Sequence, residues 1–365
     1  MKIALLAHLK HPIAQPFAGG LEMQTHLLAR GLRERGHDVV LFASQGSDPA
    51  LEPRTVCAAT GEAFNDPVRA LEVDAIEFAA YSNILEAVAE GDFDLVHNNS
   101  LHDLPLRAVR NLRAPMLTVL HTPPFPSLVA GVEAAGTDMT YAVVSMTLAQ
   151  DWQLHVSAAH IVGNGIDLST FRFEADAARP SYAFWSGRIV PEKGLHLAID
   201  AARLAGLPLV FAGPRNDVCY WNAEIAPRVG SDLTDLGHLP HADLAHHLGR
   251  ACVALVTPRW EEPFGLVVAE AVACGTPVAA FARGALPDLV TPSCGRCARA
   301  DDVEDLARAI REACRLDRYS CRSYGEAMFD AGTMIDTYEA LYRTIFATPS
   351  RVAAEPGQAL DAAAV

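Results

Sequence analysis

The sequence is short of positive charge and has no long hydrophobic run. Its 365 residues include 29 lysines and arginines against 44 aspartates and glutamates, so the net charge is −15. Such an acidic chain lacks the attraction that non-specific nucleic-acid binding needs, and it is a poor match to an anionic membrane surface. No apolar run reaches the length of about 18 residues that crosses a bilayer. We therefore expect no nucleic-acid partner and no transmembrane segment.

Cysteines are also few, and no leader segment is evident. The opening residues MKIALLAH lack the longer apolar region and the small-residue cleavage site of a secretory signal. Eight cysteines in this length favour reduced thiols and a cytoplasmic location. Cys294 and Cys297 form a CxxC that could hold zinc or form a redox pair, but such patterns arise easily by chance. We interpret them as ordinary free thiols.

What the sequence does contain is two successive series of short apolar runs that alternate with helical periodicity. The length predicts two domains of roughly 150 residues or more. Two such series predict two parallel-sheet α/β domains, whose ligands bind beyond the carboxyl ends of the strands. The default site is then the cleft between the domains. Residues 171–180 are the best linker candidate, and residues 66–90 are expected to form a pair of acidic helices.

The strongest motif extends from Glu262 to Glu270. Pro263 and Gly265 place a turn between the first glutamate and a helix that carries the second. Free backbone N–H groups at residues 264–267 and the positive end of the helix dipole suit a diphosphate, and Glu270 could accept from two ribose hydroxyls. The alternative is two surface carboxylates. The apolar surroundings disfavour it, because a buried unpaired glutamate is costly.

Two other loops each join an expected strand to an expected helix. Arg188 offers forked donors that match phosphate oxygens, and Lys193 adds a second cation. Taken alone, both would more often be solvated surface charges; their place at the edge of a sheet changes that. Gly19 and Gly20 precede the first helix and permit close approach of a ligand. The third glycine of a dinucleotide fingerprint is missing, so a dehydrogenase loses support.

Several histidines are weaker candidates. His121 ends an expected strand and could bond a substrate hydroxyl, or it could be held by its own turn. The segment from His97 to Ser100 could line an acceptor pocket, although loop capping is the favoured interpretation. The remaining candidates lack the H-E-x-x-H pattern of a zinc helix and are interpreted as surface or loop residues: His238, His241, His246 and His247. We predict no metal site.

With these motifs the chain resembles the retaining glycosyltransferases of family 4, which have the GT-B fold, over about residues 1–346. The most specific part is the segment 262–278, which looks like the E-x7-E signature of that family and its following strand. Residues 187–194, 164–167 and 284–288 resemble its phosphate-binding, NGID and G-G-x-P-E segments. Two positions depart from the pattern: Ala285 stands where a second glycine is usual, and Asp288 where glutamate is commoner.

The resemblance implies an α/β fold of two Rossmann-like parallel-sheet domains that face each other across a cleft. Residues 1–170 would form the acceptor side and residues 171–333 the nucleotide-sugar donor side. Residues 334–347 would form a helix that crosses back to the first domain, and residues 348–365 are expected to be a disordered tail. It also implies sugar transfer from a nucleotide-diphosphate donor with retention, to a small-molecule, glycan or lipid-linked acceptor, without metal or other cofactor.

The resemblance also assigns roles residue by residue. Glu262, His121, Arg188 and Lys193 are the candidate catalytic residues. Glu270 is expected to bind the ribose, and the loops near Gly213 and Leu239 the base. The residues expected to bind the diphosphate are Arg188, Lys193, Gly20, Gly265 and Leu266, and those expected to position the sugar are Glu262, Phe264, Gly265 and His121. Gly19 and Val267 complete the donor-binding loops.

Two alternatives stay open at this point. A nucleotide-sugar 2-epimerase of the same fold would share the donor site, and a periplasmic-type sugar-binding protein would share the two-domain layout. The second would need a signal peptide and gives no reason for the cations and glutamates together. On the acceptor side, Arg107, Arg110 and Arg113 could form a basic strip for an anionic or lipid-linked acceptor, although a solvated helix face is the favoured interpretation.

Overall fold

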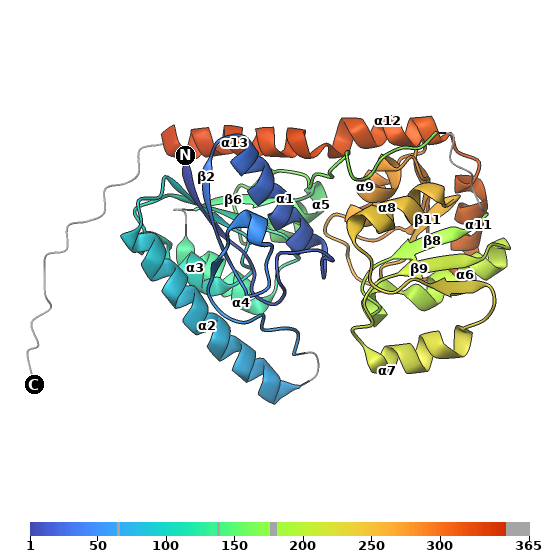
Figure 1. Ribbon diagram of the computed structural model, residues 1–365, viewed down its shortest axis with the longest axis horizontal. Helices are drawn as coiled ribbons and strands as arrows, with labels where there is room; N and C mark the ends of the chain where they lie inside the picture. Colours follow the sequence, from blue (N-terminus) through green and yellow to red (C-terminus); the bar gives the residue numbers. More distant parts are fainter. Residues whose placement is uncertain (64–65, 137–138, 176–180, 348–365) are drawn as a thin grey trace, which may run out of the picture.

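The computed structural model describes residues 1–63, 66–136, 139–175 and 181–347. Within these ranges the chain forms two parallel β-sheets that lie side by side, each flanked by helices (Figure 1). The central strands are short, mostly apolar and largely buried, as expected for parallel strands covered on both faces, whereas strands at the sheet edges are more exposed. The α/β fold with two parallel-sheet lobes is therefore as the sequence predicts.

The first sheet has seven strands in the order β3-β2-β1-β4-β5-β6-β7. Its strands are β1 Lys2–Leu6, β2 Asp38–Ala43, β3 Arg54–Thr55, β4 Leu95–Asn98, β5 Met116–Leu120, β6 Thr140–Val143 and β7 His160–Ile161. The helices of this lobe are α1 Gly20–Glu34, η1 Pro49–Leu51, α2 Pro67–Glu90, α3 Asp103–Ala108, η2 Val109–Asn111, α4 Pro126–Ala135 and α5 Met146–Trp152.

The second sheet has six strands in the order β10-β9-β8-β11-β12-β13. They are β8 Ala183–Ser186, β9 Leu209–Ala212, β10 Leu233–Asp235, β11 Val253–Val256, β12 Val278–Phe281 and β13 Gly295–Ala298. Its helices are η3 Pro191–Lys193, α6 Leu195–Ala205, α7 Val218–Tyr220, η4 Trp221–Ile225, η5 Ala226–Arg228, α8 His241–Arg250, α9 Leu266–Ala273, α10 Leu286–Leu289, α11 Val303–Ala313 and α12 Arg318–Phe329.

The strand orders place the ligand-binding loops. In the first sheet the order reverses between β1 and β4, and in the second between β8 and β11. A parallel sheet opens a crevice at such a switch point, beyond the carboxyl ends of its strands. The loop after β1 carries Gly19 and Gly20, and the loop after β8 carries Arg188 and Lys193. The glycines and the cations that the sequence singles out therefore lie at the two switch points.

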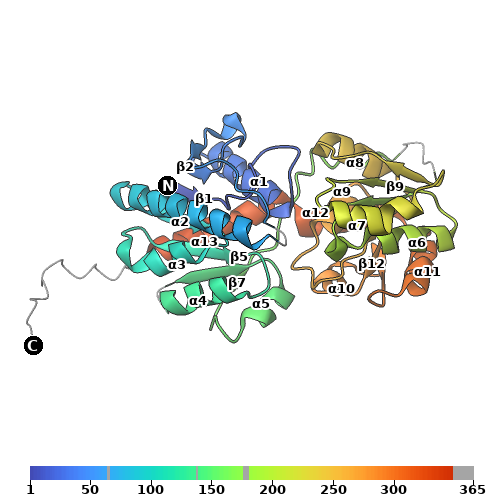
Figure 2. The same ribbon diagram turned by 90° about the horizontal axis from the view of Figure 1, so that it is seen from below.

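The last helix, α13 (Ala331–Ala347), returns from the second lobe to the first. Helices α12 and α13 lie along one side of both lobes (Figures 1 and 2). At their junction the Ile166 N–H donates to the Phe329 carbonyl at 2.7 Å, and the Ala331 N–H donates to the Ile166 carbonyl at 3.1 Å. Along α13, Tyr338 and Tyr342 are buried against the first lobe. Helix α13 thus packs on the first lobe although it follows the second lobe in the sequence.

Some elements differ from those expected. Residues 67–90 form one continuous helix, α2, so the predicted pair is wrong; the segment has no glycine or proline after Pro67 that would end a helix within it. The sequence prediction also missed α4, α12 and β13. Residues 176–180 of the expected linker and the expected disordered tail 348–365 lie outside the described residues. No helix among those described is long and apolar enough to span a membrane.

Candidate active site

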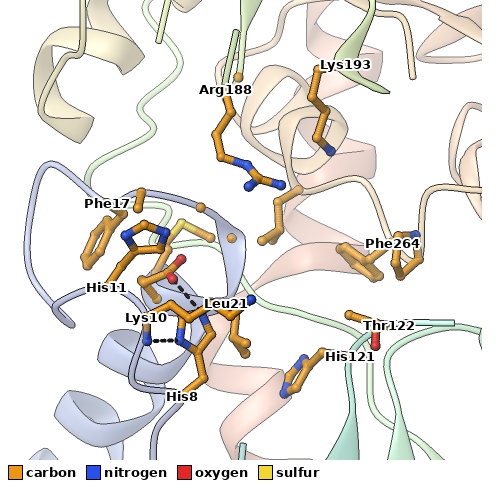
Figure 3. Close-up of a pocket in the computed structure, with 18 of the residues that line it drawn as sticks. His8, Lys10, His11, Phe17, Leu21, His121, Thr122, Arg188, Lys193 and Phe264 are labelled. Atoms are coloured by element: carbon orange, nitrogen blue, oxygen red, sulfur yellow. Dashed lines mark hydrogen bonds and ion pairs between the residues drawn. The ribbon is translucent and has the colours of Figure 1, made fainter. Parts of the chain in front are cut away.

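A cavity of about 910 Å³ lies between the two sheets, and every residue predicted to bind the donor or to be catalytic lines it. Arg188 and Lys193 reach into it from one side, and His8, His11 and His121 lie on the other (Figure 3). The fold therefore brings these loops, which lie far apart in the sequence, together around one cavity. The predicted residues on its wall are Gly19, Gly20, His121, Arg188, Lys193, Gly213, Leu239, Glu262, Phe264, Gly265, Leu266, Val267 and Glu270.

Two helix N-termini meet at this cavity. Helix α1 begins at Gly20 and α9 begins at Leu266, one from each lobe. They come so close that a Cβ atom at Gly20 would lie 2.5 Å from the Leu266 Cδ1 atom, so glycine permits the approach. Each N-terminus offers unpaired N–H groups and the positive end of a helix dipole. Together they form a place suited to an anionic group.

The Lys193 side chain is held at the cavity wall by two partners. Its Nζ atom lies 2.7 Å from Glu262 Oε2 and 4.9 Å from the centre of the Trp260 ring. The Trp260 indole N–H donates to the same carboxylate oxygen at 3.0 Å. Lys193 and Glu262 are mostly buried. The ammonium group is thus fixed in place, facing a cavity where a phosphate could contact it.

Arg188 also faces a carboxylate, and this one comes from the other lobe. Its Nη1 atom lies 3.6 Å from Glu62 Oε1, and Lys10 Nζ lies 3.2 Å from Glu62 Oε2. The neighbouring His11 ring, with Lys10 and Arg188, lowers the pKa of Glu62 to about 2. Glu62 is therefore a carboxylate anion that holds cations from both lobes across the cleft.

Glu270 lies inside α9 and lines the cavity although its side chain is almost wholly buried. Burial alone raises the pKa of this carboxyl group to about 8, because a charge is poorly solvated in the protein interior. The group is therefore mostly protonated at pH 7. A ligand that offers hydroxyl groups would give the charged form the hydrogen bonds that it lacks.

His121 follows β5 and lies at the floor of the cavity on the first lobe. Its Nε2 atom lies 2.9 Å from Asn99 Oδ1. Burial, with further contributions from His97 and His8, lowers the pKa of His121 to about 3. The imidazole is neutral at pH 7, so it acts there through hydrogen bonds and not through charge.

The sequence missed several cavity residues. His238 is an exposed loop residue, as interpreted, and it lines the cavity. His241 also lines the cavity, but it begins helix α8 and is partly buried, so its interpretation as a surface or loop residue is wrong. His238 Nε2 lies 2.9 Å from the Phe17 carbonyl oxygen in the opposite lobe, and the His241 ring lies 4.9 Å from the Phe17 ring. Nothing local marked these two residues, because their partner is more than 200 residues away in the chain.

A buried ion pair was also missed. His8 Nε2 lies 2.8 Å from Glu22 Oε1, and Glu22 is almost inaccessible. Burial raises the pKa of Glu22, but the hydrogen bond and charge of His8 outweigh this effect and lower it below its ordinary value. The pair fixes the loop after β1 onto the first turn of α1. The Gly-Gly-Leu-Glu spacing at the start of that helix could have pointed to it.

Other predicted features lie elsewhere. His97 and Asn99 do not line the cavity but lie buried behind His121. Arg107 pairs with Asp103 at 2.6 Å, and none of the three arginines of the proposed basic strip lines the cavity. The eight cysteines are free, as interpreted. Among the described residues, no three or more His, Cys, Asp or Glu side chains form a group that could hold a metal ion.

The backbone conformation at positions 284 and 285 explains why alanine is accepted at position 285. Gly284 has a φ of +56°, and a Cβ atom on it would overlap the Glu262 backbone. The next residue, Ala285, has a φ of −76°, which any residue adopts, and its N–H donates to the Glu262 carbonyl at 2.8 Å. Only the first position of the glycine pair therefore requires glycine. At the second unusual position, the Asp288 carboxylate accepts a hydrogen bond of 3.4 Å from Thr147 Oγ1 of the first lobe.

Two parallel sheets that face each other across a cavity, joined by a returning C-terminal helix, are the layout of GT-B glycosyltransferases. Solved structures of that class align over nearly the whole chain. Sucrose-phosphate synthase from Thermosynechococcus elongatus gives a TM-score of 0.76 at 22% identity and covers 95% of this chain and 100% of that one. The Anabaena protein HepE in complex with UDP-glucose gives 0.74 at 19% identity, with 94% and 100% covered.

The chain belongs to the glycosyltransferases of family 4. The profile described as Glycosyltransferase Family 4 matches residues 18–170, and that described as Glycosyl transferases group 1 matches residues 169–328. Phosphatidyl-myo-inositol mannosyltransferase of Mycolicibacterium smegmatis is 26% identical over 82% of each chain. D-inositol 3-phosphate glycosyltransferase of Mycobacterium bovis is 28% identical over 86% of this chain and 76% of its own. The protein is thus a glycosyltransferase, as the motifs predicted.

Proposed function

We propose that the protein transfers a sugar from a nucleotide-diphosphate donor to an acceptor hydroxyl, with retention of the anomeric configuration and without a bound metal. The observation that carries the proposal is the convergence of Arg188, Lys193 and two helix N-termini on one cavity. The chain has only three lysines, and two of them, Lys10 and Lys193, line that cavity. Lysine and arginine side chains that share one cavity of an acidic protein are suited to an anionic ligand there.

The chemistry requires a leaving diphosphate to be stabilised. The acceptor oxygen forms a bond to the anomeric carbon on the face from which the β-phosphate oxygen departs. The acceptor proton moves to that departing oxygen. Arg188, Lys193 and the N–H groups at the starts of α1 and α9 stabilise the developing negative charge. They can replace the divalent cation that other diphosphate-transferring sites use.

Each other group has a proposed part. Glu270 binds the ribose hydroxyls, Glu262 and His121 bind the donor sugar, and the loop near Gly213 and Leu239 receives the base. The acceptor enters from the first lobe, where His8, Lys10 and His11 line the cavity. We also propose a cytoplasmic location, in keeping with the free cysteines.

The test begins with a thermal-shift screen of UDP, GDP and ADP, followed by incubation with sugars of the best nucleotide. The acceptor panel takes its chemistry from the names of the relatives: myo-inositol, inositol 3-phosphate, phosphatidylinositol and a glucan. We expect a glycoside with the anomeric configuration of the donor, and the same rate in the presence of EDTA. An inverted product, a rate abolished by EDTA, or conversion of the donor to its 2-epimer without transfer would each contradict the proposal.

A further inference from the structure

Behind His121, four buried side chains form a continuous hydrogen-bonded chain that the proposed reaction does not use. Tyr342 Oη lies 2.6 Å from His97 Nδ1. His97 Nε2 lies 3.0 Å from Asn99 Oδ1, which lies 2.9 Å from His121 Nε2. The four residues come from α13, β4, the loop after β4 and the position directly after β5. The crossing helix is therefore joined to a cavity residue by three hydrogen bonds.

This hydrogen-bonded chain of four side chains determines which ring nitrogens of His97 and His121 carry a proton. An amide oxygen only accepts, so both histidine Nε2 atoms that face Asn99 Oδ1 carry hydrogen. The amide nitrogen of Asn99 also has a partner, because Asn99 Nδ2 donates to Thr25 Oγ1 at 3.3 Å. A neutral imidazole has a single N–H. His97 Nδ1 must then accept from the Tyr342 hydroxyl, and His121 Nδ1 is left with a lone pair.

Both histidines are neutral at ordinary pH. Burial lowers the pKa of His97 to about 4 and that of His121 to about 3. His121 lines the cavity, and no described residue bonds its Nδ1 atom. The free lone pair is therefore the polar group that His121 can offer to a ligand.

We propose that Tyr342, His97 and Asn99 are positioning residues that hold His121 in its Nε2–H tautomer, so that Nδ1 accepts a hydrogen bond from a hydroxyl of the donor sugar. The sugar as ligand follows from the proposed function, whereas the tautomer follows from the hydrogen bonds alone. A nitrogen that can only accept binds an O–H group and repels a carboxylate. At the position facing His121, the site then favours a hexose over the matching uronic acid.

The first test needs no ligand. Selectively ¹⁵N-labelled histidine reports by NMR which ring nitrogen carries the proton, and a His121→Gln variant assigns the signal. In the full-length protein at pH 7 we expect Nε2–H at both His97 and His121. Tyr342→Phe removes the hydroxyl that donates to His97, and we expect a second tautomer to appear at both rings. His121 with its proton on Nδ1, or a His121 signal that Tyr342→Phe leaves unchanged, would overturn the proposal.

The helix offers a matched control. Tyr338 lies one turn earlier on α13, its ring is 6.1 Å from that of Tyr342 and 5.1 Å from that of His97, and it too is buried. Its hydroxyl is not part of the chain. Tyr338→Phe should therefore leave the tautomers of His97 and His121 as they are in the unsubstituted protein. The same change of tautomer in both variants would indicate a general loosening of α13 and would overturn the positioning role.

Calorimetry with UDP and UDP-glucose separates positioning from folding. Because the hydrogen-bonded side chains orient His121 toward the sugar, Tyr342→Phe should weaken UDP-glucose binding by about three- to tenfold, the contribution of one hydrogen bond. It should leave UDP binding unchanged. Equal losses for both ligands would overturn the positioning role. If the unsubstituted protein binds neither UDP nor UDP-glucose, GDP with GDP-mannose and ADP with ADP-glucose take their place in the same measurement. If no pair binds, the proposed donor class fails and the NMR result alone decides the tautomer.

Discussion

The Lys193 ammonium group lies 2.7 Å from the Glu262 carboxylate at the wall of the cavity. An ion pair so shielded from solvent is costly to break by removing one partner. The diphosphate of a donor would give Lys193 a second anion while Glu262 keeps its hydrogen bond from the Trp260 indole. The pair thus holds the lysine in place before the ligand arrives.

Loss of either cation should slow the reaction. We expect Lys193→Ala and Arg188→Ala each to lower kcat by at least about tenfold, because less charge remains to stabilise the leaving diphosphate. The control is Arg259→Ala, which removes a nearby arginine that pairs with Asp301 at 3.6 Å and does not line the cavity. Steady-state kinetics with the identified donor measure the effect. A normal kcat in Lys193→Ala would argue against its assigned role.

Releasing Arg188 from its carboxylate should strengthen diphosphate binding. Glu62 lies 3.6 Å from Arg188 and competes with a phosphate for it. We expect Glu62→Gln to tighten the binding of the nucleotide diphosphate by about two- to fivefold at low salt, in the range of a partly exposed ion pair. Glu192→Gln, which removes a more exposed carboxylate 3.8 Å from Arg188, should have a smaller effect. Weaker binding in Glu62→Gln would mean that Glu62 serves to orient the arginine.

The two neighbouring positions 284 and 285 should respond differently to substitution. Gly284→Ala places a Cβ atom into the Glu262 backbone at a positive φ, and we expect activity to fall by at least about tenfold because Glu262 is displaced. Ala285→Gly restores the usual glycine pair at a φ of −76° and should change activity by less than about threefold. Comparing kcat/KM for the two variants tests this, and similar losses in both would contradict it.

Glu270 should make the stability of the empty protein depend on pH. Its pKa is raised to about 8 in the folded state from an ordinary value of 4.5. A raised pKa means that the folded state binds the proton more tightly than the unfolded state, so its stabilising effect is full below pH 4.5 and is lost as the pH rises through 8. Glu270→Gln stays neutral throughout. We expect its Tm to rise relative to the unsubstituted protein as the pH increases from about 5 to about 9.

The measurement for Glu270 is a series of thermal melts without ligand at equal ionic strength. Glu304→Gln serves as the control, because Glu304 lies exposed in the first turn of α11. A difference between Glu270→Gln and the unsubstituted protein that stays constant with pH would contradict the prediction. With nucleotide present the order should reverse, since the single amide oxygen of a glutamine side chain cannot accept from both ribose hydroxyls as a carboxylate does.

The sequence by itself determined most of the strands, the loops after them and the residues that those loops carry. The apolar runs and the glycines and prolines that end them are local signals, and they placed Arg188, Lys193 and the Glu262–Glu270 segment at sheet edges before any fold was known. The same signals failed at α2, where a continuous run of helix-forming residues was divided in two.

Only the tertiary structure decided which residues face each other across the cleft. Glu62 meets Arg188, His238 meets Phe17, and Tyr342 reaches His97. The two members of each pair lie far apart in the chain, and neither carries a local pattern that names its partner. Hydrogen bonds and ion pairs form only between atoms a few ångströms apart. Local sequence propensity does not bring these residues so close together; the packing of the two lobes and the return of α13 do.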